Sequence, residues 1–455
     1  MKKIFRFLVP ALLLVAASPS PAKSQSDILP SEPTDSLHVN LETALEVALQ
    51  SSPTIIIADR EITRTHYARK EAQSGFWPTI AASGTYNRTL KKQVMAMDFG
   101  GETMEISVGT DNNWAAGLNL ALPLVAPALW KTVQLSNLDI ELAVESARAS
   151  RVTMISSVKK AYFAYLLAKD SYNVLQRNYN NVALNTKIVT DKFDQGLASE
   201  YDKLRAEVQL KNQRPALLAA EAAIELASMQ IKALMGVDVD YPIIFEGTLS
   251  DYESEVNQES YLQNASFSLA QNSALRQMDI QKKQLETALQ ITRASYMPTL
   301  ALASAFQYSS MNNNFKFSTY KWYTYSNAAL SLSIPIFSGM SKQQKVKQSQ
   351  LTMQTLDDTR LNTERNLQIS VHGCLVKMEN AIADLASNKE NMAMAEKAYS
   401  ISQKQFDVGM TTWLELSSSE LALTQARLAY HQSIYDYMSY MAELDSVLGK
   451  NNTNN

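Results

Sequence analysis

The chain contains one long unit twice. The tetrapeptide Phe-Asp-Gln-Gly at 193–196 recurs as Phe-Asp-Val-Gly at 406–409, and Gly236 recurs as Gly449 at the same offset. Proline-centred segments recur in the same order: Trp77-Pro78-Thr79-Ile80 is matched by Met297-Pro298-Thr299-Leu300, and Leu122-Pro123-Leu124 by Ile334-Pro335-Ile336. Such duplication predicts two similar halves related by internal pseudo-symmetry. We divide the chain into a first repeat at 41–236, an inter-repeat segment at 237–259, a second repeat at 260–449 and a polar tail at 450–455.

The N-terminus has the pattern of a secretory signal peptide. Lys2, Lys3 and Arg6 precede an apolar run at 7–17, which small residues follow. This predicts export, with a signal peptide at 1–25 cleaved between Ser18 and Gln25, and an extended polar segment at 26–40. No later stretch has the roughly 18 consecutive apolar residues of a membrane helix. An exported chain of this kind is either soluble or crosses a membrane as a closed β-barrel.

Charge and reactive side chains exclude several function classes. The net charge is −3 with no basic bias, so we expect no nucleic-acid partner. The single cysteine, Cys374, lies in the second repeat, so we expect no disulfide and no lipid on the N-terminus. The histidines are far apart in sequence, which argues against a metal site, and we expect no cofactor. They are His38, His66, His372 and His431.

Alternation with a period of two predicts four strands, at about 78–90, 113–125, 297–309 and 322–337. Small or polar residues alternate with leucines, which are Leu118, Leu120, Leu122, Leu300, Leu302, Leu330 and Leu332. A leucine face opposite a small polar face suits a barrel with lipid outside and water inside. A half-buried strand of a soluble sandwich would alternate as well.

Polar loops at 89–113 and 309–321 join the strands of each pair. Trp114, Trp322 and Tyr323 stand beside these loops. Aromatic residues at strand ends are typical of a belt at the lipid headgroups, although β-propensity alone also places them there.

Two segments, 128–195 and 341–408, lack proline, and the one glycine in either of them is Gly373. Both segments carry a seven-residue apolar repeat. They predict coiled-coil rods, each about 100 Å long at 1.5 Å per residue. Return helices at 200–235 and 413–448 are about half as long. The helix that precedes each strand pair must therefore continue the return helix end to end. Pro215 predicts a kink in the first return helix.

These features together resemble the TolC-like outer-membrane factor family, over about residues 37–449. The resemblance rests on the signal peptide, the duplicated helix-strand-strand-helix unit, the prolines of the second strands and the Phe-x-x-Gly turns. It implies a mainly α fold in which a homotrimer shares a twelve-stranded membrane β-barrel, continued by a long periplasmic α-helical barrel. It also implies an efflux or secretion duct in the outer membrane of a Gram-negative bacterium, working with a periplasmic adaptor and an inner-membrane pump. Four strands cannot close a membrane barrel alone, which independently demands an oligomer.

The resemblance also implies a gate at the periplasmic tip. The acidic ring of the family falls on Glu415 and its partner acid on Asp202, whereas the tyrosine and arginine of the family's latch are Phe406 and Thr411 here. That latch is therefore in doubt, and we expect packing of Phe193 and Phe406 to replace it. The surface that docks the adaptor would be Gly196, Leu197, Ala198, Gly409, Met410 and Thr411.

Two other function classes stay open at this point. A periplasmic coiled-coil adaptor or scaffold would explain the rods but not the strands. An enzyme could use Glu415 and Asp202 as paired acids, but acids beside a helix start more often complement the helix dipole, and no Ser-His-Asp set or phosphate loop is present. We expect a channel and no enzyme, and the sequence does not name the cargo.

Overall fold

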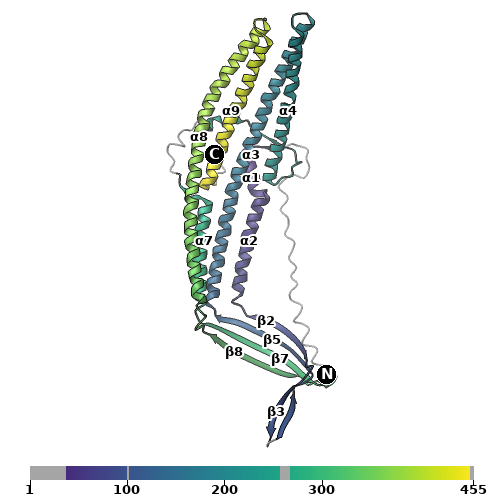
Figure 1. Cartoon of the computed structure of the whole chain (residues 1–455), viewed down its shortest axis with the longest axis vertical. Coiled ribbons are helices and arrows are strands. Elements are labelled where there is room, and N and C mark those ends of the chain that lie inside the picture. The colour runs from purple at the N-terminus through teal and green to yellow at the C-terminus, as the bar shows by residue number, and fades with distance from the viewer. Residues whose placement is uncertain (1–36, 100–101, 257–266, 451–455) are drawn as a thin grey trace.

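The computed structural model describes residues 37–99, 102–256 and 267–450. The predicted signal peptide, most of the extended segment after it and nearly all of the tail lie outside the described residues. The molecule is elongated, with a β-sheet at one end and two helical pairs that reach separate tips at the other (Figure 1).

Four long helices form the body. The rods are α3 (Pro127–Asp194, 68 residues) and α8 (Ser341–Asp407, 67 residues). The return helices α4 (Glu200–Met235) and α9 (Trp413–Leu448) have 36 residues each. These bounds lie within one residue of the expected ranges, because proline or a capping side chain begins α3, α4 and α9, and glycine follows the end of all four helices. Helix α4 continues through Pro215, where a kink stays a prediction.

Shorter helices complete each repeat near the sheet. The first repeat has α1 (Leu41–Ser51) and α2 (Pro53–Ser74), and the second has the 3₁₀ turn η2 (Leu269–Gln271) and α7 (Ser273–Ala294). On the sheet side the helices contact one another in the order α2, α3, α7, α8. On the tip side the order is α4, α3, α9, α8. Thus α4 continues the line of α2, and α9 that of α7 (Figure 1).

A glycine in the left-handed region marks each end-to-end junction. Gly236 ends α4 with φ +72° and lies so close to Ser51 that an added Cβ would be 2.5 Å from its carbonyl oxygen. Gly449 ends α9 with φ +72°, and its Cβ would be 2.1 Å from the carbonyl oxygen of Gln271. Only glycine fits both the backbone angle and the space.

The main sheet has the strand order β2-β5-β7-β8, antiparallel throughout. Its strands are β2 (Thr79–Arg88), β5 (Asn112–Val125), β7 (Thr299–Asn312) and β8 (Tyr323–Ser333). Strand β8 ends before Pro335, short of the expected 337, whereas β5 continues past Pro123 with a register shift. Proline cannot donate a ladder hydrogen bond, so it ends a strand or accompanies an irregularity.

The segment 89–113 is not simply a polar loop, so that expectation was wrong. It contains a hairpin of β3 (Gln93–Phe99) and β4 (Glu102–Val108), which extends away from the main sheet (Figure 1). Its strands pair antiparallel, with Met95 opposite Ile106. The sequence alternates poorly there because Val94 and Met95 are adjacent apolar residues on opposite faces of the hairpin.

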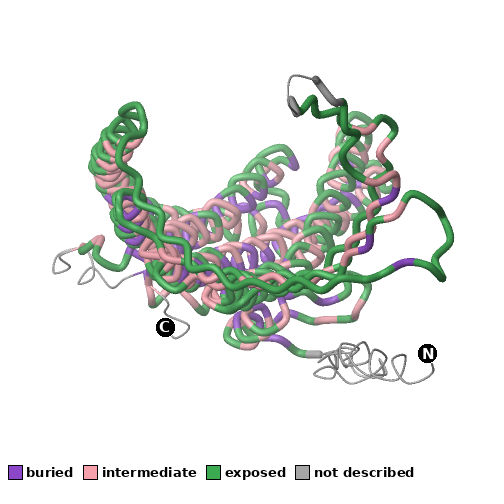
Figure 2. Tube along the Cα trace, turned by 90° about the horizontal axis from the view of Figure 1, so that it is seen from below, coloured by how far each residue is buried: buried purple, intermediate pink, exposed green. Residues whose placement is uncertain are grey.

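The largest core lies at the junction level, the equator of the molecule. There β1 (Leu37–Val39), from the segment expected to be merely extended, pairs in parallel with β6 (Ile243–Phe245) of the inter-repeat segment. The turn η1 (Leu249–Tyr252) and α5 (Glu253–Val256) follow. Tyr162 of α3 is buried against Phe245 and donates a hydrogen bond to the carbonyl oxygen of Glu246 at 2.6 Å. Buried residues gather among the helices, while the strands are largely exposed (Figure 2).

Candidate functional site

The sheet register places all seven predicted leucines on one face. Residues directly opposite in antiparallel strands share a face, and residues two apart on one strand do so as well. Leu122 pairs with Leu302, which pairs with Leu330, and Leu300 pairs with Leu332. The other face carries small or polar residues such as Ala303, Ala329 and Ser331. The alternation seen in sequence is thus a continuous property of the three neighbouring strands β5, β7 and β8, and Ile80 of β2 lies on the same face.

The three predicted belt aromatics do not share a face. Trp114 pairs with Ser310 on the leucine face and stacks on Tyr86, with ring centroids 4.2 Å apart. Trp322 stacks on Tyr308, another residue of that face. Tyr323 pairs with Ser309 and points to the opposite face. Consecutive residues of a strand alternate sides, so Trp322 and Tyr323 cannot both join one belt.

None of the described helices is both long and apolar enough to span a lipid bilayer. Within the same described ranges, no three or more His, Cys, Asp or Glu side chains are grouped as a metal site would require.

Both tips are built as Schellman turns. After α3 the amide of Gly196 donates to Phe193 and that of Leu197 to Lys192, each at 2.8 Å. After α8 the amide of Gly409 donates to Phe406 at 3.1 Å, and the next amide donates to Gln405 at 2.8 Å. The glycines have φ +75° and +79°. These bonds satisfy the last carbonyl groups and reverse the chain.

The turns present an apolar surface to solvent. Leu197 is 74% exposed and Met410 is 79% exposed, and both follow a turn glycine directly. Ala198 and Thr411, the other predicted docking residues, come next along the chain and are half-buried. The sequence-predicted docking set is therefore gathered into two separate tips.

A small core lies just behind the tips and joins the two helical pairs. Phe406 and Trp413 are buried with Val189, Ala206 and Leu416. Lys192 of α3 lies over the Phe406 ring at 4.4 Å from its centroid, and Arg205 of α4 lies over Trp413 at 6.0 Å. Phe193 is outside this core, half-buried under Lys203 at 4.7 Å. Of the two phenylalanines expected to pack the tip, Phe406 lies within its core.

The two tip acids sit in equivalent capping positions. Ser199 caps α4 by accepting from the amide of Asp202 at 3.1 Å, and its hydroxyl donates to the Asp202 carboxylate at 2.6 Å. Thr412 caps α9, and the Glu415 carboxylate accepts from the hydroxyl of Thr411 and the amide of Thr412. These hydrogen bonds hold the pKa of Glu415 below its usual range. Within this one chain Glu415 completes a capping box at the start of α9, whereas the Asp202 carboxylate is bound only to the hydroxyl that caps α4.

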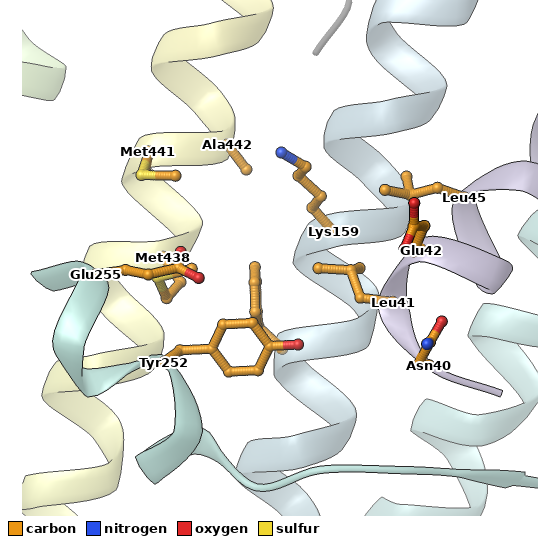
Figure 3. A pocket seen from close by; sticks show the side chains of 11 residues that line it. Asn40, Leu41, Glu42, Leu45, Lys159, Tyr252, Glu255, Met438, Met441 and Ala442 are labelled. Carbon is orange, nitrogen blue, oxygen red and sulfur yellow. The ribbon is translucent and has the colours of Figure 1, made fainter. Parts of the chain in front are cut away.

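The equator contains a cavity of about 360 Å³ between α1, α3, α9 and the inter-repeat segment. The Lys159 side chain extends into it between Ala442 and Leu45, with Met438 and Tyr252 below (Figure 3). Lys159 is 5% exposed, yet its sequence context contains nothing that distinguishes it from a solvent-facing lysine.

Comparison with known proteins identifies the family. The sequence model of the outer membrane efflux protein family matches residues 44–237 and 265–450. The chain belongs to this family. It is similar to the outer membrane protein TolC of Vibrio cholerae serotype O1, with 19% identity over 337 residues, 74% of this chain and 76% of that protein.

Solved structures of outer membrane channels share the fold. The outer membrane channel CmeC of Campylobacter jejuni has a TM-score of 0.72 at 17% identity, covering 90% of this chain and 85% of that one. The channel MtrE of Neisseria gonorrhoeae, in its open state, has a TM-score of 0.69 at 17% identity, covering 91% of each chain. The predicted resemblance is confirmed. The chain is an outer membrane protein of a Gram-negative bacterium and serves as an exit duct in efflux, in a family of channels and not of enzymes.

Sequence reasoning missed a buried polar seam of this efflux protein, between α3 and α9. Glu420 of α9 is 5% exposed and faces Asn181 and Asn185 of α3. Nearer the equator, His431 of α9 lies 3.7 Å from the Asp170 carboxylate of α3. Burial lowers the pKa of His431, and the Asp170 charge opposes that effect. In sequence, Glu420 follows three serines and looks like a solvent-facing helical acid, so no local signal predicts its burial.

A buried ionic network at the second junction was also missed. Arg148 of α3 donates to the Glu145 carboxylate at 2.6 Å, to the carbonyl oxygen of Gln271 at 2.6 Å and to that of Gly449 at 3.1 Å. One guanidinium thus bonds both sides of the α9–α7 junction. Glu145 is an i,i+3 neighbour within α3, but Gln271 and Gly449 are far from Arg148 in sequence, so only the folded chain reveals those two contacts.

Proposed function

We propose that three copies of this chain close one twelve-stranded barrel in the outer membrane and one helical tunnel in the periplasm. The observation that carries this proposal is the four-stranded sheet, with a leucine face across three of its strands and, among the described residues, two free edges. Its outer strands β2 and β8 have 10 and 11 residues and pair on one side only. Open edges cannot remain in lipid, so β8 of one copy would pair with β2 of the next.

The helices support the same arrangement. Exposed apolar residues lie on both outer helices of the wall, for example Leu204 and Leu218 on α4, and Leu351 and Ile369 on α8. A helix at the edge of a monomer has no partner for such residues, and a neighbouring copy would supply one. The internal repeat would then make the ring quasi-sixfold.

The tips would form the regulated entrance of the duct. Leu197 and Met410, with their neighbours in the two turns, would dock a periplasmic adaptor that links the duct to an inner-membrane pump. Three Glu415 carboxylates would converge near the axis, with Asp202 on the adjacent return helix. Their role as caps does not remove their charge, so the ring would favour cations. Phe406 in its packed core would hold the two helical pairs together.

A direct test begins with the assembled protein. The outer membrane fraction should yield a detergent-soluble trimer that changes gel mobility on heating, and bilayers containing it should show discrete conductance steps. A monomer without conductance would refute the channel assembly. Glu415→Ala should weaken cation preference and Asp202→Ala should raise the open fraction, whereas unchanged selectivity and conductance in both would leave the acids as caps only.

Docking is tested separately by crosslinking in a Cys374→Ser background. Photoreactive labels on Leu197→Cys and Met410→Cys should capture the adaptor. Capture from the inter-repeat segment 237–259, with none from the turns, would contradict tip docking.

A further inference from the structure

The seam between α3 and α9 joins the two helical pairs over the periplasmic half of the molecule. Each pair is internally packed, α3 on α4 and α8 on α9, and the tips themselves are separate (Figure 1). The seam and the small tip core are therefore the contacts that must change if the pairs move apart. Glu420 lies in this seam between the tip core at Leu416 and the equator.

The carboxyl group of Glu420 is buried without a charged partner. Its Oε1 atom is inaccessible and has no hydrogen-bond partner in the part of the chain that the structure describes. Across the described ranges, no lysine, arginine or histidine nitrogen lies within salt-bridge distance of it. The groups that face it are Asn181 and Asn185 of α3 and the Tyr399 phenol of α8.

The nearest cation on its own helix is already engaged. Arg427 of α9 lies two turns away and is bound to Glu396 of α8 at 2.8 Å. A buried carboxylate without a cation is unstable, whereas the neutral acid can remain in the seam and donate a hydrogen bond to an amide oxygen. The seam therefore fits the neutral form better than the ionised form.

We propose that Glu420 is a proton-operated latch of the duct: its neutral carboxyl holds α9 against α3, and its ionisation favours separation of the two helical pairs. This deepens the proposed function, on which it rests, by naming a regulator of the entrance. The latch acts through seam packing and not through the acids exposed at the tip.

The direction of the pH effect follows from burial. Desolvation raises the pKa of Glu420 from 4.5 to about 7, although hydrogen bonds from Asn181 and Asn185 oppose the shift. Protonated Glu420 therefore contributes its full stabilisation of the closed seam below pH about 4.5. This contribution decreases between pH 4.5 and 7 and is lost above pH 7. The ratio of closed to separated seams should fall by up to about two orders of magnitude across this window.

The test measures the separation of the tips in the full-length protein. Spin labels are placed on Leu197→Cys and Met410→Cys in a Cys374→Ser background, and labelled chain is diluted with unlabelled chain. Their distance distribution should shift to longer values between pH 5 and 8 in the otherwise native chain. Glu420→Gln, which is isosteric and neutral, should keep the short distribution throughout. Glu390→Gln, at an exposed acid of α8 outside the seam and the tips, is the matched control and should respond to pH like the parent.

A second variant keeps the test decisive if Glu420→Gln fails to assemble. Asn181→Lys places an ammonium beside Glu420, so it should hold the tips together at pH 8, and adding Glu420→Gln to it should release them. A parent chain whose tip distances do not change with pH, or a Glu420→Gln variant that follows the parent, would overturn the latch. If conductance persists in that case, only the latch fails, whereas loss of conductance in the parent would refute the proposed duct assembly.

Discussion

The end-to-end junctions predict a graded cost for adding one methyl group to a glycine. At Gly449 an alanine would have to keep φ near +72° with its Cβ 2.1 Å from the carbonyl oxygen of Gln271. The backbone angle alone costs an L-residue about 1 to 2 kcal/mol. The contact cannot persist at that distance, so the end of α9 must move away from η2.

That movement breaks two hydrogen bonds across the junction. Arg148 donates to the Gly449 carbonyl oxygen at 3.1 Å, a charged bond that contributes about 1.5 to 3 kcal/mol. Asn272 donates to the Val447 carbonyl oxygen at 2.6 Å, a neutral bond that contributes about 1 kcal/mol. Alanine recovers about 0.4 to 1 kcal/mol by restricting the unfolded chain. We therefore expect Gly449→Ala to lower the free energy of unfolding by about 3 to 5 kcal/mol.

Gly409→Ala is the matched control, because Gly409 has φ +79° but nothing within 4 Å of an added Cβ. It should cost about 0.5 to 1 kcal/mol, and Gly236→Ala should fall between the two. Guanidinium unfolding of the detergent-solubilised protein, followed by the helical circular dichroism signal, gives the three values. An equal cost at Gly449 and Gly409 would refute the close packing of the end of α9 on η2.

Three further substitutions test other parts of the fold. Arg148→Met should lower the free energy of unfolding by about 2 to 4 kcal/mol in the same assay, because it removes both bonds to the junction carbonyl groups and leaves the buried Glu145 with only the longer pair to Arg276. Arg151→Met, at an exposed pair, should cost at most about 1 kcal/mol, and similar values for the two variants would mean that the junction network contributes nothing. Leu302→Arg should cost about 2 to 4 kcal/mol in membrane assembly and reduce the yield of heat-modifiable oligomer, while Ala303→Arg on the opposite face is tolerated; the reverse order would invert the assignment of the two faces. Thr412→Ala should destabilise α9 by about 1 kcal/mol, seen as earlier fraying in hydrogen exchange of its first turn, and unaltered exchange there would count against the cap.

Local signals explain why the long elements are predictable from sequence. Residues next to each helix end mark its position. A glycine follows Met235 and Leu448, and a capping serine or threonine precedes Glu200 and Trp413. The alternating leucines likewise lie on one face of the sheet, because the strand register places directly opposite residues on the same face. The duplication extends these local inferences to both halves.

The sequence does not reveal which polar residues the fold buries. Glu415 and Glu420 are acids of one helix, five positions apart, yet the first is an exposed cap and the second lies inside the seam. The difference depends on α3, which contacts one side of α9 and comes from the other repeat.

By itself the sequence determined the family, the duplicated order of elements and the turn glycines, because these depend on periodicity, capping and backbone angle. Tertiary structure alone decided the hairpin at 93–108, the faces of Trp322 and Tyr323, the contact of Gly449 with Gln271 and the burial of Glu420. Each of these depends on strand pairing or on contacts between segments that are distant in the chain. Such contacts produce no periodic pattern in the sequence of either segment.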